Sequence, residues 1–193
     1  MRLCLLVLFL AGCSSSIDRP AGILVADAPV QTRIEEPRLF LHKGLAVRPV
    51  AEFSAAARVL STEWYRGGDE GRLAPVDLAV GWGRMSDSAV LEHMDIDQHN
   101  RFYFWQRDQN APAHLALSKL DVVKQSTNIH VIPASDALAG QLRSVKPGHV
   151  VQLEGRLVNV KLSNGANWRS STSRTDVGNG ACELLFLESL VVE

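Results

Sequence analysis

The segment His149-Val150-Val151-Gln152-Leu153-Glu154-Gly155-Arg156-Leu157-Val158-Asn159-Val160 carries the clearest secondary-structure pattern in the chain. It follows a turn at Pro147-Gly148, and its residues alternate between apolar and polar, as in a half-buried β-strand. The apolar face consists of Val151, Leu153, Gly155 and Leu157, and the polar face of Gln152, Glu154 and Arg156. A glycine within a strand eases sharp curvature, so Gly155 favours a strand that bends around a small core.

Other segments with strand or helix signals lie on both sides of this strand. The predicted strands are 45–60 (interrupted at Pro49), 101–105, 128–132, 168–171 and 184–192. Capping residues at 86–88 and 135–136 predict two short helices, at 89–92 and 137–145. Residues 73–83 contain Pro75 and two glycines, which favours irregular structure or a short helical turn there.

Five or six strands with two short helices predict an α+β protein that is mainly β. The arrangement Gly-x-x-Val-x-Leu-x-Gly-x-Leu at 148–157 resembles strands of OB-like barrels. This resemblance implies a small, partly closed antiparallel barrel. A generic α+β fold remains the alternative, because many β-proteins share such a strand.

The composition indicates an ordinary globular domain. Hydrophobic residues make up 46% of the 193 residues and charged residues 21%, which allows a sizeable core. The formal net charge of −1 provides no basic field, so nucleic acid is not expected as a partner.

The N-terminus predicts an export signal. Arg2 precedes an apolar run at 3–11, which is too short to span a bilayer and is typical of a signal peptide. The run ends in Leu10-Ala11-Gly12-Cys13, which resembles the lipobox of bacterial lipoproteins. The resemblance implies acylation of Cys13, and Ser14 after it implies the outer membrane, facing the periplasm. The alternative for the N-terminus is an ordinary signal peptide, and the alternative locations are the inner membrane and the cell surface.

These features divide the chain into three parts: a signal peptide at 1–12, a lipidated cysteine with a flexible tether at 13–34, and one globular periplasmic domain at 35–193. A first strand at 22–25 is the alternative for part of the tether. Segments 75–78 and 169–183 resemble parts of bacterial proteins to which no activity is attached.

Two glycine-bearing loops are the candidate binding sites for a ligand or partner. The first presents Trp82, Arg84 and Asp87, and the second presents Trp168, Arg169, Arg174 and Asp176. An aromatic ring with arginine and carboxylate groups can hold a polar ligand. The structural alternatives are that Trp82 plugs the barrel, while the second loop is a solvated hairpin loop.

Signals for catalysis are weaker. The candidate acid–base groups for a hydrolase are Asp77, Asp87, His130 and Asp176, provided that they meet in one cleft. A triad of Ser171, His130 and Asp87 has no supporting nucleophile motif. Cys182 is the only cysteine after Cys13 and lies in an apolar run. It is interpreted as a buried small hydrophobe, with a reactive thiol as the alternative.

Two further segments are candidate sites. Residues 93–99 would place two histidines and two aspartates on one face of a strand, but the preceding helix signal favours a solvated turn over a metal site. The aromatic run 102–105 offers one face to the core; the other face is expected to be covered by a helix, with an exposed stacking surface as the alternative. No metal ion or cofactor is therefore expected.

The sequence thus predicts a lipid-anchored envelope protein with a non-enzymatic binding or assembly role. Its partners would be the membrane, through the lipid, and a protein or other envelope component. A periplasmic hydrolase acting on an envelope substrate is the alternative.

Overall fold

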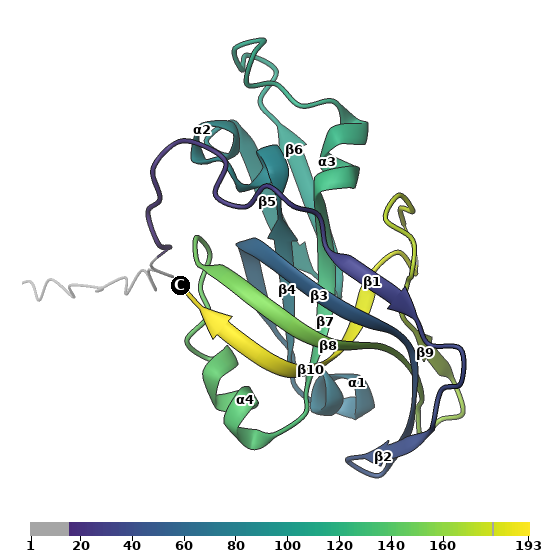
Figure 1. The fold of residues 1–193 in the computed structure, drawn as a ribbon. Coiled ribbons are helices and arrows are strands. Elements are labelled where there is room, and N and C mark those ends of the chain that lie inside the picture. The colour runs from purple at the N-terminus through teal and green to yellow at the C-terminus, as the bar shows by residue number, and fades with distance from the viewer. Residues whose placement is uncertain (1–15, 179) are drawn as a thin grey trace, which may run out of the picture.

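A computed structural model describes residues 16–178 and 180–193, so the predicted signal peptide and Cys13 lie outside the described residues. Figure 1 shows a β-rich molecule with short helices around its sheet. The strands are β1 Val30–Arg33, β2 Phe40–His42, β3 Leu45–Trp64, β4 Val76–Gly81, β5 Met94–His99, β6 Phe102–Arg107, β7 Ser126–Pro133, β8 Val150–Lys161, β9 Asn167–Arg169 and β10 Glu183–Val192. The helices are α1 Gly68–Leu73, the 3₁₀-helix η1 Gly83–Ser86, α2 Ser88–Leu91, α3 Lys119–Gln125 and α4 Asp136–Leu142.

Five strands pair into a ring in the order β3, β4, β7, β10, β8 and back to β3. The β7–β10 pair is parallel and the other four pairs are antiparallel. The mainly-β, partly closed architecture predicted from residues 148–157 is therefore confirmed, with one parallel pair that the sequence did not indicate. The short β5–β6 hairpin forms a separate sheet beside this ring.

The strand β8 behaves as its pattern predicts. Buried and exposed residues alternate along it, and it pairs with β3 on one side and β10 on the other. A Cβ atom on Gly155 would lie 2.1 Å from the carbonyl oxygen of Phe186. The missing side chain therefore lets β10 approach closely, next to its register shift between Leu187 and Ser189.

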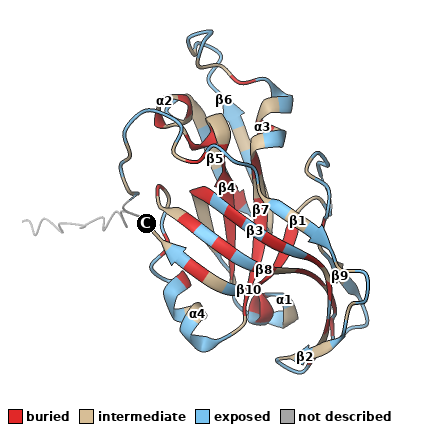
Figure 2. Ribbon diagram, viewed as in Figure 1, coloured by how far each residue is buried: buried red, intermediate tan, exposed pale blue. Residues whose placement is uncertain are grey.

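The core fills the inside of the ring. Alternate residues of β3, β4, β7, β8 and β10 point inward, and Leu142 and Val145 from the α4 region join them. Figure 2 shows the buried residues concentrated on these central strands. Burial of each of these leucine or valine side chains stabilises the folded state by about 1.5–3 kcal/mol. The bend in β3 lies at the register shift after Pro49, which has no backbone N–H to donate to β8.

The outer face of the ring is also covered. A second core lies between α1, the outer faces of β7 and β10, and the curled ends of β3 and β8. A third core lies beneath α2, α3 and the β5–β6 hairpin. Residues that point outward from β4, β7 and β10 are consequently shielded from water.

Three segments differ from the sequence-based expectation. Residues 16–34, expected as a tether, lie against the domain: Val25 is buried in the core, and Arg19 donates to the backbone of Gly148. Residues 73–83, expected to be irregular, contain the fully buried strand β4. Residues 94–99, expected as a turn, form β5. Helices α2 and α4 were predicted, whereas α1 and α3 were not.

None of the helices in the described part of the chain is long and apolar enough to cross a bilayer.

Candidate functional site

The first predicted loop, at Trp82–Asp87, has structural roles. Trp82 is 3% exposed and belongs to the core inside the ring, so its indole is not available to a ligand. This burial favours the barrel-plug alternative over the ligand-binding interpretation of Trp82. Arg84 donates to the carbonyl oxygen of His114, and Asp87 caps α2 and accepts from the backbone of Gly22.

The second predicted loop lies elsewhere on the ring, with its side chains directed to different partners. Arg174 pairs with the buried Glu183, and Asp176 accepts a hydrogen bond from Ser171 at 2.7 Å. Arg169 is exposed. Trp168 packs beside the imidazole of His130, with their ring centroids 5.2 Å apart. Of these residues, Trp168 contacts the cluster described next, and Asp176 lines the cavity beside that cluster.

A buried ionic cluster lies on the outer face of β4 and β7. Asp77 and His130 are paired residues in the antiparallel register of these strands, so their side chains lie on the same face. Asp77 Oδ2 is 3.0 Å from His130 Nδ1, and the two side chains are 1% and 7% exposed. The ring N–H is not aligned for a linear hydrogen bond, so the contact is an ion pair.

Cys182 lies beside this pair because of the parallel β7–β10 pairing. Glu183 is opposite Ile129 in that register, which places the preceding Cys182 next to Asn128, on the face that also carries His130. Asn128 Nδ2 lies 3.6 Å from Cys182 Sγ. The thiol also interacts with His130. Aspartate, histidine and thiol are thus brought together from β4, β7 and the residue that precedes β10.

The tip of the β5–β6 hairpin closes the cluster. Asn100 and Arg101 both have positive φ, 52° and 69°, as in the two-residue turns that join tight hairpins. The Arg101 guanidinium lies 3.8 Å from the ring centroid of Tyr65 and donates to Asp77 Oδ1 at 2.6 Å. The Arg101 carbonyl oxygen accepts from Asn128 Nδ2 at 3.2 Å. The hairpin therefore contributes both a charge and a backbone acceptor.

The electrostatics of the cluster favour a protonated histidine. Burial by itself lowers the pKa of His130, but its interactions with Asp77 and Cys182 outweigh burial and raise the pKa to about 9. The imidazolium is consequently the main form at neutral pH. The imidazolium lies beside the Cys182 thiol, and the thiolate is the nucleophilic form of cysteine.

A cavity of about 360 Å³ opens beside Cys182. Its size falls in the range of small-molecule sites. Cys182 and Asn128 form part of its wall, and the aromatic run of β6 forms another part. The remaining apolar lining includes Val123, Val177 and Ala181. The β6 face that was expected to be covered therefore lines a cavity in part.

The candidate acid–base residues named from the sequence are only partly brought together. Asp77 and His130 meet, whereas Asp87 caps α2 and Asp176 bonds Ser171. The suggested Ser171–His130–Asp87 triad is not formed, since Asp87 lies at α2 and Ser171 is occupied by Asp176. Cys182 is interpreted from the sequence as a buried small hydrophobe because it lies in an apolar run with no obvious base near it, and His130 is 52 positions away. A prediction that the strands at 128–132 and 184–192 pair with each other would have placed Cys182 near His130.

Within 16–178 and 180–193, no group of three or more metal-ligating side chains is placed to hold an ion. The histidines and aspartates of 93–99 instead form pairs, such as His99 with Asp97 at 2.8 Å.

Comparisons with known proteins leave the site to be judged on its own geometry. No family model matches the chain, and no curated protein and no solved structure matches it significantly.

Proposed function

We propose that this protein is a cysteine-dependent acyl hydrolase or acyltransferase of the bacterial cell envelope. The observation that carries the proposal is the placement of the Cys182 thiol beside His130, which is itself paired with the buried Asp77. A nucleophile next to a base that a third group orients is the recurring arrangement of nucleophilic catalysis.

The proposed reaction proceeds in two halves. The Cys182 thiolate attacks a carbonyl carbon and forms an S–C bond, while the carbonyl π electrons move to oxygen. As the carbonyl re-forms, the leaving group departs and takes the proton of the His130 imidazolium. His130 then accepts a proton from water or an acceptor alcohol, which attacks the thioester and releases Cys182. Asn128 Nδ2 is the donor near the sulfur that can stabilise the developing oxyanion.

The cavity beside the thiol suggests the substrate class. Its lining combines Phe102, Phe104 and Trp105 with aliphatic side chains, and carries few charged groups. Such a lining favours an apolar or aromatic acyl group over a charged one. An ester or thioester of a medium-length acyl chain fits this chemistry.

The proposed location rests on the lipobox-like tetrapeptide at 10–13. Acylation of Cys13 would hold the domain at the outer membrane, in reach of acylated envelope components. Because residues 16–34 lie against the domain, the proposed anchor would keep the domain close to the bilayer.

Turnover of 4-nitrophenyl butyrate by the full chain tests the proposal. Cys182→Ala and His130→Gln are each expected to lower the turnover number by at least about 100-fold. His114→Gln changes an exposed histidine outside the cluster and the cavity, and this matched control should retain wild-type activity. An acylated intermediate should appear on the tryptic peptide 175–193, which contains Cys182 as its only cysteine. Equal turnover by wild type and Cys182→Ala would refute thiol catalysis.

A non-enzymatic binding role is the second candidate, because the aromatic wall of the cavity does not depend on the thiol. Under this proposal the cavity binds an apolar group of an envelope component without turnover. Saturable binding of butyrate esters without hydrolysis, unchanged in Cys182→Ala and lost in Phe104→Asp, would favour binding over catalysis.

A further inference from the structure

A second, larger cavity lies away from Cys182, where the end of β3, the loop after it, α1 and the end of α4 meet. Its volume is about 970 Å³. Its lining residues are Trp64, Tyr65, Arg66, Gly67, Gly68, Asp69, Gly71, Arg72, Pro75 and Arg143. Three of these ten residues are arginines, and one is an acid. The cavity is therefore distinguished by its positive charge.

Most of that charge has no partner on the protein. Among the described residues, Arg72 pairs with Asp69 at 2.7 Å, whereas no carboxylate lies within ion-pair distance of Arg66 or Arg143. Asp69 also accepts from the backbone N–H of Ser163. The single acid of the cavity is thus occupied, which leaves two guanidinium groups without a compensating anion.

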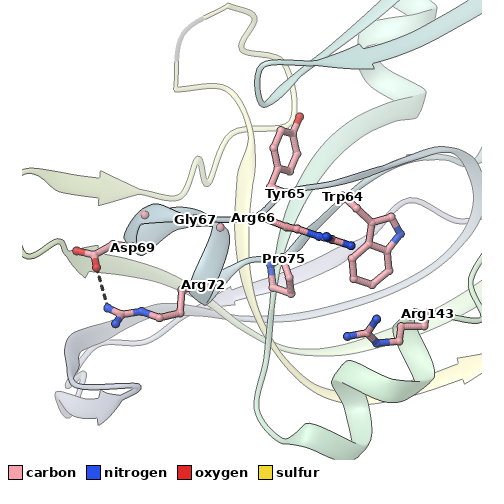
Figure 3. A pocket seen from close by; sticks show the side chains of 10 residues that line it. Trp64, Tyr65, Arg66, Gly67, Asp69, Arg72, Pro75 and Arg143 are labelled. Atoms are coloured by element: carbon pink, nitrogen blue, oxygen red, sulfur yellow. Dashed lines mark hydrogen bonds and ion pairs between the residues drawn. The ribbon is translucent and has the colours of Figure 1, made fainter.

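These two guanidinium groups lie around one aromatic ring. Figure 3 shows Arg66 extending toward Trp64, and Arg143 pointing into the same space from the end of α4. Arg143 Cζ lies 5.8 Å from the centroid of the Trp64 ring, and Trp64 is 39% exposed. A ligand could therefore contact two positive charges and a flat apolar surface at once.

The backbone leaves the centre of the cavity open. Gly67 and Gly68 have φ of 78° and 60°, and nothing lies within 4 Å of the position of a Cβ on either residue. At Gly71 a Cβ would lie 2.8 Å from the carbonyl carbon of Arg66. The absence of a side chain at Gly71 therefore allows α1 to pack against the backbone of Arg66.

We propose that this cavity binds a phosphate monoester that carries a planar or ring-shaped apolar part. The two unpaired guanidinium groups match the charge of a phosphate monoester, which is about −1.5 to −2 at neutral pH, better than that of a single carboxylate. Guanidinium forks also match the geometry of phosphate oxygens. Trp64 packs against the ring. The phosphate monoester group itself occurs both on membrane lipid headgroups, such as phosphatidic acid, and on free ring-bearing small molecules, and separate probes distinguish these sources.

Isothermal titration of the full chain with phenyl phosphate tests the site. The double variant Arg66→Gln/Arg143→Gln is expected to weaken binding at least tenfold. The matched control Arg38→Gln/Arg48→Gln removes two exposed arginines outside the cavity and should bind as the wild type does. Arg66→Lys/Arg143→Lys keeps the charge but not the fork, and should fall in between. Equal melting temperatures of the four proteins show that folding is not the cause.

Flotation with vesicles distinguishes the sources of phosphate. In a full-length Cys13→Ser background, binding to phosphatidic acid vesicles is compared with binding to phosphatidylcholine vesicles. A loss of the difference in the Arg66→Gln/Arg143→Gln variant supports a lipid headgroup, and a loss confined to phenyl phosphate supports a free ligand. Equal binding of both probes by the wild type and this double variant would overturn the proposal, as would no binding of either probe by the wild type.

Discussion

The stability of the protein should depend on pH between about 6.5 and 9 because of His130. Its pKa is raised from 6.5 to about 9 in the folded protein, where it faces Asp77 from β4, Arg101 from the hairpin tip, and Cys182. A raised pKa means that the folded state holds the proton more tightly than the unfolded state. The stabilisation is therefore complete below pH 6.5 and is lost as the pH rises through about 9. At about 1.36 kcal/mol per pH unit, this interval corresponds to about 3 kcal/mol.

Urea unfolding of the full chain at pH 6 and pH 9.5 measures this contribution. The free energy of unfolding of the wild type should fall by about 3 kcal/mol between the two values, and that of His130→Gln by less than about 1 kcal/mol. His114→Gln is the control, because this exposed histidine lies outside the cluster. The other histidines with resolved shifts, His42 and His149, have lowered pKa values and titrate below this interval. If His130→Gln and wild type lost equal stability, the charged Asp77–His130 pair would be refuted.

Two further predictions concern the ring and its outer face, and urea unfolding measures both. Gly155→Ala places a Cβ 2.1 Å from a backbone oxygen of β10 and should cost about 3 kcal/mol, whereas Gly140→Ala in α4 meets nothing within 4 Å and should gain up to about 1 kcal/mol. Equal effects of the two substitutions would contradict the close approach. Asp77→Asn leaves two buried cations without an anion and should cost about 3–5 kcal/mol at pH 7, while the exposed Asp95→Asn should stay within about 0.5 kcal/mol. A small effect of Asp77→Asn would mean that water reaches the cluster.

The parts of the fold that could be predicted have one buried and one exposed face. β8 and β3 alternate between buried and exposed residues, so their period of two is visible in the sequence. β4 was missed because it is buried on both faces, and its outward residues include a charged one, Asp77. Because residues 73–83 show no alternation of apolar and polar residues, Pro75 and the nearby glycines led to the prediction of irregular structure. A period of two appears in the sequence of a strand only when one face is buried and the other contacts solvent, and both faces of β4 are buried.

The candidate site could not be predicted for a related reason. Asp77, His130 and Cys182 are separated by about fifty residues each, and only the order of the strands places them side by side. The sequence identified the strands of His130 and Cys182, but not that they pair in parallel. Asp77 and His130 were named as acid–base candidates from residue type alone. The two interpretations of Trp82 could not be separated from the sequence, because flanking glycines are as compatible with a buried bend as with an exposed loop.

The energetics of the outer face argue that the cluster is more than a structural feature. Burying a carboxylate, an imidazolium and a guanidinium costs several kcal/mol per ion, and well-packed apolar residues of similar volume are often as stabilising or more so. The surrounding outer face is in fact apolar, with Ile132, Leu184 and Phe186 packed in the neighbouring core. An apolar trio at positions 77, 101 and 130 would continue that core. A charged trio whose histidine contacts the only thiol among the described residues, beside an aromatic-lined cavity, has a chemical rationale that packing alone does not supply.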